Sequence, residues 1–448
     1  MNEAPADDDG GAAGSADAAR GPVARLLARL FGDEADVVRD RTFQILLLGS
    51  VVSPMGASVV SPVLESLATP YGVSVARVGL LMAAFTAPSI VAIPLVGALS
   101  DRIGRRPVLA AGLAVFGVAG GAAAFTADFR IVVGLRLVQG IGYCGIGPVL
   151  IASVGDLFAG EREATAQGVR FATVGLSLTL FPVLAGVLVT RDFRLPFLLF
   201  LLGLPVALVV LLVFDEPTGA TDAGDDGDEP VPEATAGALV ERLRDPLVVA
   251  ALLGRAVPSF LWFAFLTYAS VVTGRLLGAT PGVAGLVVGL ASVGSAVGGT
   301  QVGRLTAAFD GRGIPLVATM AVFGAGLAAF GFADSLPVAA VGAALVGAGF
   351  GTVLTLYRST VTGLADASAR GGLVSIGESA GRLGSTAAPL ALGSVIAVAT
   401  PVFGFETAVR YVLLGTAAAG TIAGLPLGLL AGRAHGRATD DAGVFEAD

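Results

Sequence analysis

Long apolar runs follow one another along the chain, and charged residues or turn-forming glycine and proline separate them. A helix needs roughly 20 apolar residues to cross the hydrocarbon core of a bilayer. The runs have this length, so the pattern predicts an all-α polytopic membrane protein with twelve transmembrane helices. The predicted spans are 43–65, 76–99, 107–126, 130–155, 167–190, 195–214, 246–273, 280–302, 314–333, 336–360, 371–398 and 408–431.

An acidic segment at 215–245 divides the spans into six and six. Of the 35 acidic residues, nine lie in 1–42, ten in 215–245 and four in the last nine positions. Such charge-rich, small-residue segments stay solvated, so we assign these acids to tails and a linker and not to a ligand site. The predicted organisation is an acidic tail with a short amphipathic helix at 1–42, a six-helix bundle at 43–214, a linker at 215–245, a second six-helix bundle at 246–432 and a tail at 433–448.

Arginine gives the orientation of the spans. Of the 27 arginines, 18 fall on the side that the termini share with the linker, and six fall on the opposite side. Positively charged loops stay on the cytoplasmic side of a membrane. We therefore expect a multi-pass protein of the plasma membrane with both termini in the cytoplasm.

Composition agrees with the pattern and excludes several function classes. Hydrophobic residues make up 54% of the chain, charged residues 14%, and the mean hydropathy is +0.83. The chain has no lysine, so it cannot hold the lysine of a phosphate-binding P-loop, and its single His435 and single Cys144 leave little for metal or nucleophilic chemistry. A net charge of -8 argues against a nucleic-acid partner. We expect a protein of the lipid bilayer that is not an enzyme and needs no cofactor or metal.

The two halves resemble each other at a nearly constant offset. Gly97 corresponds to Gly303 at an offset of 206, and Pro182 corresponds to Pro389 at 207. Six crossings in each half leave both halves in the same orientation. Parallel repeats of this kind place the substrate at the midplane between the halves and expose it to either side by rocking.

The loop after the second span carries the sequence GALSDRIGRRP at 97–107, which resembles the 2-3 loop signature of the major facilitator superfamily. Further similar stretches are RLVQG at 136–140, GEREA at 160–164 and FRLPF at 193–197. The resemblance extends over about 43–432. It implies two parallel six-helix repeats, a monomer, and secondary transport of a small-molecule substrate together with a coupling ion.

The resemblance also implies a gating role for the loop. The aspartate at 101 would meet the start of the eleventh span, and Arg105 would pair with an acid at the inner end of the fourth span, where Asp156 lies. Gly104 permits a tight turn, and Gly97 removes a side chain where a helix of the other half could approach. The alternative is that the arginines only set the topology. The predicted gating residues are Gly97, Asp101, Arg102, Gly104, Arg105, Arg106 and Asp156.

Ionisable groups at bilayer depth are costly and therefore candidates for function. Glu378 and Arg382 share a face of the eleventh span, and the balance between desolvation and a neighbouring cation can bring a carboxyl group into its titration range. We expect Glu378 to carry the coupling proton with Arg382 beside it, unless the two form a permanent ion pair. Arg136 matches the family arginine associated with proton coupling, or is a structural arginine bound to carbonyl groups.

Polar and aromatic side chains in the spans are candidates for the substrate cavity, with packing as the alternative for the aromatic ones. Arg255 would bind an anionic substrate or extend to the inner interface. The predicted cavity residues are Gln139, Tyr143, Arg255, Trp262, Tyr268 and Tyr357.

The direction of transport rests on weaker signals. The proline and glycine at 182 and 186 are a remnant of the antiporter signature in the fifth span, and they favour proton-coupled efflux of a drug or metabolite. The first alternative is proton- or sodium-coupled uptake of a nutrient or organic anion. A second alternative is a membrane sensor or scaffold that does not transport.

Overall fold

A computed structural model describes residues 35–216, 244–309, 311–363 and 367–445. The expected short helix within 1–42 and most of the acidic linker lie outside these residues. Within them, every regular element is helical, and 12 helices or helix series are long and apolar enough to cross a membrane. The predicted number of spans is therefore confirmed.

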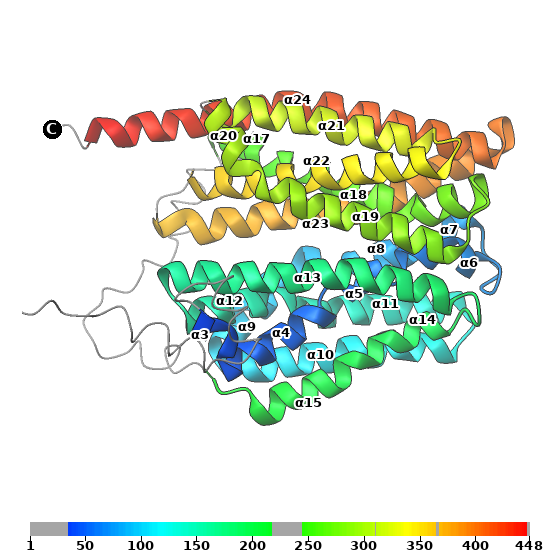
Figure 1. Cartoon of the computed structure of the whole chain (residues 1–448), viewed down its shortest axis with the longest axis horizontal. Coiled ribbons are helices and arrows are strands. Elements are labelled where there is room, and N and C mark those ends of the chain that lie inside the picture. Colours follow the sequence, from blue (N-terminus) through cyan, green and yellow to red (C-terminus); the bar gives the residue numbers. More distant parts are fainter. Residues whose placement is uncertain (1–34, 217–243, 310, 364–366, 446–448) are drawn as a thin grey trace, which may run out of the picture.

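The elements of the first half, shown in blue to green in Figure 1, are given in chain order. They are α3 (Ala35–Arg39), α4 (Arg41–Val52), α5 (Met55–Ser58), η2 (Ser61–Val63), α6 (Leu64–Ala68), α7 (Val75–Val78), α8 (Leu80–Thr86), α9 (Ser89–Ile103), α10 (Arg105–Ala122), η3 (Ala123–Phe125), α11 (Phe129–Cys144), α12 (Gly147–Leu157), α13 (Gly160–Leu188), α14 (Leu195–Leu198), η4 (Leu199–Leu202) and α15 (Gly203–Val213).

The elements of the second half continue in green to red. They are α17 (Pro246–Gly254), α18 (Ala256–Ser270), the π-helical η5 (Val271–Leu276), α19 (Pro281–Thr300), α20 (Val302–Ala308), α21 (Gly313–Gly331), α22 (Leu336–Gly363), α23 (Ala367–Phe403) and α24 (Phe405–Phe445).

Most boundaries lie within a few residues of the predicted ones, and the start of α13 and the end of α24 differ most. It begins at Gly160, whereas the prediction began at 167. The charged residues Glu161 and Glu163, expected in a loop, form its first turn instead, where acidic side chains favour the helix N-terminus. The helix therefore extends beyond its apolar portion. The last helix, α24, likewise continues to Phe445, past the end of the twelfth span predicted at 431.

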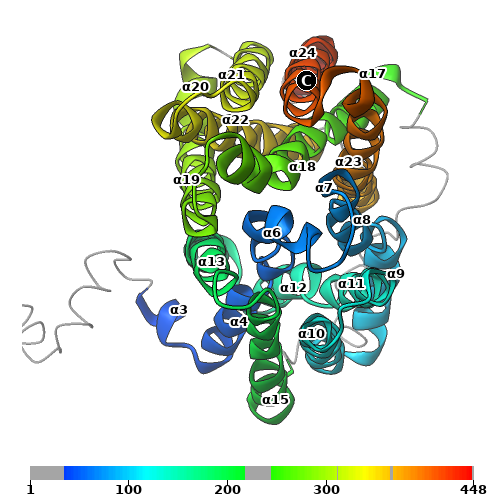
Figure 2. The same ribbon diagram turned by 90° about the vertical axis from the view of Figure 1, so that its right-hand side faces the viewer.

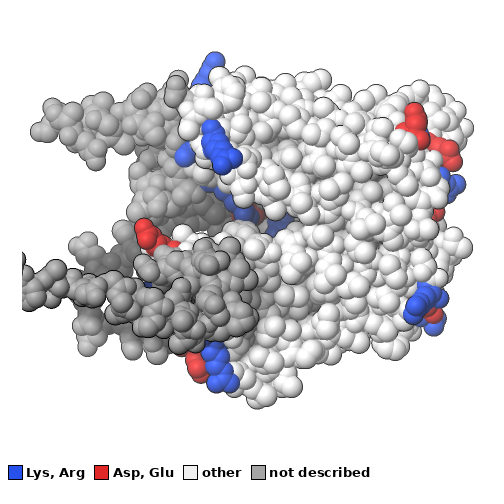
Figure 3. Space-filling view, in the orientation of Figure 1, with Lys and Arg blue, Asp and Glu red and all other residues white. Residues whose placement is uncertain are grey.

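The two halves lie side by side with their helices roughly parallel (Figure 1). We call the end where α9 and α15 finish and α17 begins the linker side, and the opposite end the far side. Charged side chains gather at these two ends and leave a broad uncharged belt between them (Figure 3). This distribution is the one that a lipid bilayer requires of a spanning protein.

On the far side the two halves touch. Ser61 donates a hydrogen bond to the carbonyl oxygen of Leu266 at 2.5 Å, and the amide of Glu65 donates to Ser270 Oγ at 3.2 Å. Figure 2, which views this side, shows α6 and α7 of the first half beside α18 and α23 of the second. These contacts close the far side.

On the linker side the halves separate. The helices α12 and α17 pack chiefly against elements of their own halves. The surface in Figure 3 is hollowed between the halves at this end, with charged atoms visible inside the hollow. Among the described residues, the halves therefore meet on the far side and leave the linker side open, and we call this state closed on the far side and open on the linker side.

Candidate transport pathway

A cavity lies between the two halves near the middle of the spans, and both halves line it. Among the lining side chains in the described part of the chain, Arg382 is the one formally charged residue. The others are apolar, aromatic or hydroxyl-bearing. The lining residues are Ser53, Pro54, Ala57, Ser58, Phe85, Tyr143, Leu178, Trp262, Phe263, Leu266, Val288, Ser292, Ser295, Phe350 and Arg382.

Aromatic rings form two walls of the cavity. Trp262 and Phe350 are stacked with ring centroids 4.6 Å apart and an angle of 8° between their planes. Phe85 and Tyr143 lie in the other half with centroids 5.4 Å apart. Flat apolar surfaces of this kind suit a ligand with an apolar body.

Arg382 joins the two halves across the cavity. Its Nη2 donates a hydrogen bond to Tyr143 Oη at 3.2 Å, and its guanidinium carbon lies 5.2 Å from the centre of the Tyr143 ring. The contact connects α23 of the second half with α11 of the first. If the halves move to open the far side, the hydrogen bond between Arg382 and Tyr143 must either break or shift with them.

The predicted partner of Glu378 is not the partner in the structure. Glu378 lies one turn before Arg382 on α23, but it makes ion pairs with Arg255 at 3.6 Å and Arg358 at 3.2 Å. The i, i+4 spacing places Glu378 and Arg382 on the same face, yet Arg382 extends to Tyr143 instead. The two remain close enough to attract each other through space.

Arg358 is the residue of this cluster that sequence reasoning missed. The predicted tenth span ends at 360, which places Arg358 at a helix end, among the 18 arginines of the linker side that indicate topology. It does lie near the end of α22, but its side chain points back to Glu378 on α23. Only the position of α22 beside α23 reveals this contact.

Arg136 is buried inside the first half and bound mainly to carbonyl oxygens. Its side chain is 0% exposed and donates to Leu81 O at 3.1 Å and Gly56 O at 2.6 Å, and its third hydrogen bond goes to Gln139 Oε1 at 2.6 Å. The ring of Phe85 lies 4.5 Å from its guanidinium carbon. These contacts agree with the structural reading of Arg136, because they hold three spans of one half together.

The predicted cavity residues separate into two groups. Tyr143 and Trp262 line the cavity, whereas four others do not appear among its lining residues. Arg255 forms an ion pair with Glu378 and also donates a hydrogen bond to Ser259. The remaining three are buried in the packing of their own halves, where a role toward substrate stays a prediction: Gln139, Tyr268 and Tyr357.

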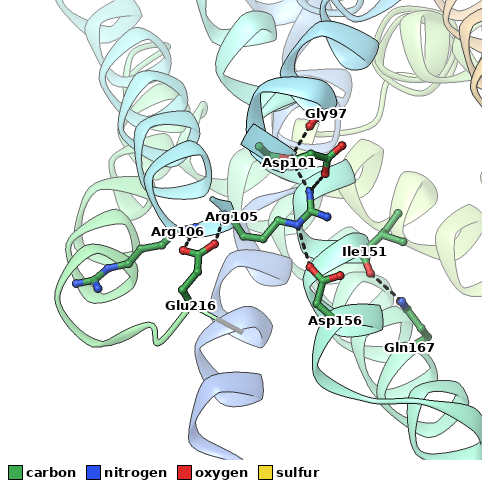
Figure 4. Close-up of polar contacts among 9 residues, drawn as sticks. Gly97, Asp101, Arg105, Arg106, Ile151, Asp156, Gln167 and Glu216 are labelled. Carbon is green, nitrogen blue, oxygen red and sulfur yellow. Dashed lines mark hydrogen bonds and ion pairs between the residues drawn. The ribbon is translucent and has the colours of Figure 1, made fainter. Parts of the chain in front are cut away.

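The loop after the second span is held by a network on the linker side (Figure 4). Gly104 has a φ of 97°, so the turn needs a residue without a Cβ. Arg105 Nε then donates to Asp156 Oδ2 at 2.9 Å, and Arg105 also pairs with Asp101. The expected pair of Arg105 and Asp156 is therefore present, and it ties the loop to the end of α12.

Glu216, just after the last helix of the first half, is a second anchor of this loop that the sequence did not reveal. Its carboxylate accepts hydrogen bonds from the backbone amides of Arg105 and of Arg106, the latter at 3.1 Å. The Arg106 side chain in turn donates to the carbonyl oxygen of Leu211 in α15. Its place in an acidic segment made Glu216 look like one of many solvated acids.

The expected contacts of Gly97 and Asp101 with the other half are not seen among the described residues. Gly97 faces open space, since a Cβ there would have no neighbour within 4 Å. The expected close approach to the other half is therefore absent in this state, which is open on that side. Arg102 is exposed. The side chains at the start of α23 lie outside the described residues, so a contact of Asp101 with them stays a prediction.

With the fold and its central cavity described, comparison with known proteins identifies the class. The model of the Major Facilitator Superfamily matches residues 46–389. The chain belongs to this superfamily, whose members move small solutes across membranes. It is a multi-pass membrane protein of a family of transporters.

Similar proteins of known function match over part of the chain. The bacillibactin exporter of Bacillus subtilis is 32% identical over 162 residues, which are 34% of this chain and 40% of the relative. The class C tetracycline resistance protein of Escherichia coli is 33% identical over 165 residues, 34% of this chain and 40% of the relative. The chain thus spans about two fifths of the length of these relatives.

Solved structures resemble the fold over nearly its whole length. A bacterial homologue of the lysosomal transporter Spinster, inward-facing and unoccupied, has a TM-score of 0.76 at 16% identity and covers 89% of this chain and 97% of its own. A D-xylose-proton symporter has a TM-score of 0.65 at 17% identity, with 84% and 96% covered. At such identities the likeness concerns the fold alone.

Proposed function

We propose that this protein is a proton-coupled exporter of small organic molecules, which works by alternating access in the plasma membrane with both termini in the cytoplasm. The observation that carries the proposal is the cavity between the halves, closed on the far side and open on the linker side, with Glu378 one helical turn before the lining residue Arg382. A single site reachable from one side at a time is what alternating access requires.

The direction is supported by the similar proteins and by the arginine bias. Proteins that match about a third of the chain are named as an exporter and as resistance proteins. The linker side carries most of the arginines and so corresponds to the cytoplasm. The open cavity would then take up its substrate from inside the cell and release it outside, in exchange for a proton.

Glu378 is our candidate for the group that binds this proton. Its side chain is 26% exposed, it lies on the open side, and two arginines hold it when it is ionised. Protonation would break both ion pairs and free Arg255 and Arg358 for new contacts. Proton binding would thereby change how α17, α22 and α23 are held together, which is a route from protonation to movement of the second half.

The loop network is our candidate for a gate. In the state described here, Arg105 joins α10 to Asp156 at the end of α12. Both partners belong to the first half, so the contact keeps this half rigid while the halves move relative to each other. The contact of Asp101 with α23 implied by family resemblance would form when the linker side closes.

The test uses purified protein in liposomes with an imposed pH gradient and a compound panel that includes a catecholate siderophore, a tetracycline and a quinolone. We expect the gradient to drive accumulation of at least one compound. Glu378→Gln should lose the dependence on the gradient while still exchanging substrate across the membrane. Glu406→Gln, an exposed carboxylate at the far-side start of α24, is the matched control and should behave like the wild type.

Two outcomes would contradict the proposal. Absence of gradient-driven flux for every compound in the wild type would refute proton coupling. An unchanged pH dependence in Glu378→Gln would refute the assignment of Glu378 while leaving coupling through another group intact.

A further inference from the structure

The charges next to the substrate cavity are predominantly positive. The cavity lining includes Arg382 and, in the described part of the chain, no carboxylate. A guanidinium at bilayer depth is costly and is retained where it has a task. Its hydrogen bond to Tyr143 involves a neutral phenol and leaves the charge of Arg382 uncompensated by that contact.

More guanidinium groups lie between Arg382 and the linker side. Arg255 and Arg170 are 8% and 5% exposed, and both lie close enough to Arg358 to be repelled by it. The carboxylate that faces this group among the described residues is Glu378. Even if Arg358 is left aside with its own partners, Arg255 and Arg382 lie near one described carboxylate, Glu378, and Arg170 adds a third guanidinium group that hydrogen-bonds to the neutral Gln167. The pathway therefore has an excess of positive charge.

Hydrogen-bond donors in this region are also left without partners. Arg255 Nε, Arg170 Nη2 and Tyr357 Oη are buried and make no hydrogen bond within the described chain. Buried donors are normally paired. Other buried donors of the described chain, such as Gln139 Nε2 and Tyr268 Oη, also lack acceptors, so it is the position of these three beside an excess of positive charge that suits them to a group rich in acceptors.

We propose that the transported molecule is an organic anion, with a carboxylate or similar acid group on an apolar body that has a flat face. The acid group binds Arg382 and Tyr143, and the flat face lies against the stacked rings of Trp262 and Phe350. On its way from the linker side, the anion is attracted by the positive charge of Arg255 and Arg170. This inference rests on the proposed function and names the substrate class of the same site.

The charge of such a substrate agrees with export. An anion that leaves a cell with a negative interior moves down the electrical gradient. A cation would have to pass the guanidinium groups on the linker side and would be repelled by them.

The test measures binding to the full chain in detergent, without any gradient, by calorimetry and by the shift in Tm. The probes are naphthyl and alkyl acids, each compared with its neutral amide and with the amine of the same size. We expect the carboxylates to bind about tenfold more tightly than their amides, and the amines to bind least. Arg382→Gln should abolish the preference, so that the acid and its amide bind about equally, whereas Arg382→Lys should keep part of the preference.

The control is Arg130→Gln, an exposed arginine on the far side, which should keep the full preference. Tyr143→Phe removes one proposed donor without a change in charge and should weaken binding of the acids more than binding of the amides. Equal binding of acids and amides, tighter binding of amines, no binding of any acid, or an intact preference in Arg382→Gln would overturn the proposal. Because no gradient is applied, failure of proton coupling would leave these results unchanged, so the two proposals fail separately.

Discussion

Glu216 anchors the loop after the second span, although it lies outside the sequence motif of that loop. The first backbone amides of a helix have no partner inside that helix, and the partial positive charge there favours an anion. At the start of α10 the carboxylate of Glu216 meets both needs. Gly104 makes room for it, because a Cβ at 104 would touch the carboxylate. Both the conformation of the turn and the space for the Glu216 carboxylate therefore require glycine at 104.

A neutral amide at this position should weaken the loop. We expect Glu216→Gln to lower the free energy of unfolding by about 1 kcal/mol, because an amide oxygen is a weaker acceptor than a carboxylate and does not offset the helix charge. Asp215→Asn is the matched control, since Asp215 is exposed and adjacent. Thermal unfolding in detergent measures both. Equal losses of stability in the two variants would show that Glu216 acts only through net charge.

Among the helices, the pair α13 and α19 forms the closest contact between the halves. At their far-side ends, a Cβ at Gly186 would collide with the carbonyl group of Pro281, and one at Gly285 with that of Pro182. Small residues let helix backbones approach in a membrane. Gly175 lies seven residues before Pro182 and so on the same face of α13, yet a Cβ there would meet nothing within 4 Å. Gly175 lies in the middle of α13, so the close backbone contact belongs to the far-side half of the helix pair and ends before Gly175.

The addition of one methyl group should have different effects on stability at these two positions. Gly285→Ala is expected to lower stability by about 1–3 kcal/mol, because the backbones must move apart to accommodate the methyl group, and to reduce transport by favouring an open far side. Gly175→Ala should leave the stability of this state unchanged or raise it. Thermal unfolding and labelling of the far-side loops measure the two effects. If Gly285→Ala were as stable and as protected as the wild type, the close contact would not hold the far side shut.

At the scale of the whole molecule, the sequence predicted the twelve spans and their pairing into halves, because apolar length and turn residues determine both. It also predicted the pair of Arg105 and Asp156, since a family motif supplied it. It could not predict which arginines surround Glu378. Arg382 was the neighbour along the helix, whereas Arg255 and Arg358 come from α17 and α22 only once the helices pack. Contacts between distant helices depend on tertiary geometry that periodicity does not encode.

The state described here should be one of two between which the protein moves, and a cross-link can test this. A Cβ at Gly79 in the first half would lie 3.1 Å from Thr267 Cγ2 in the second, so cysteines at both positions are close enough to form a disulfide on the far side. The native Cys144 is buried and is replaced by alanine first. We expect the oxidised double variant of Gly79→Cys and Thr267→Cys to bind substrate from the linker side but not to transport it, because the far side can no longer open. Reduction should restore transport, and each single variant should transport under both conditions. Full transport by the oxidised protein would mean that this part of the far side stays closed throughout the cycle, and that the substrate leaves by another route.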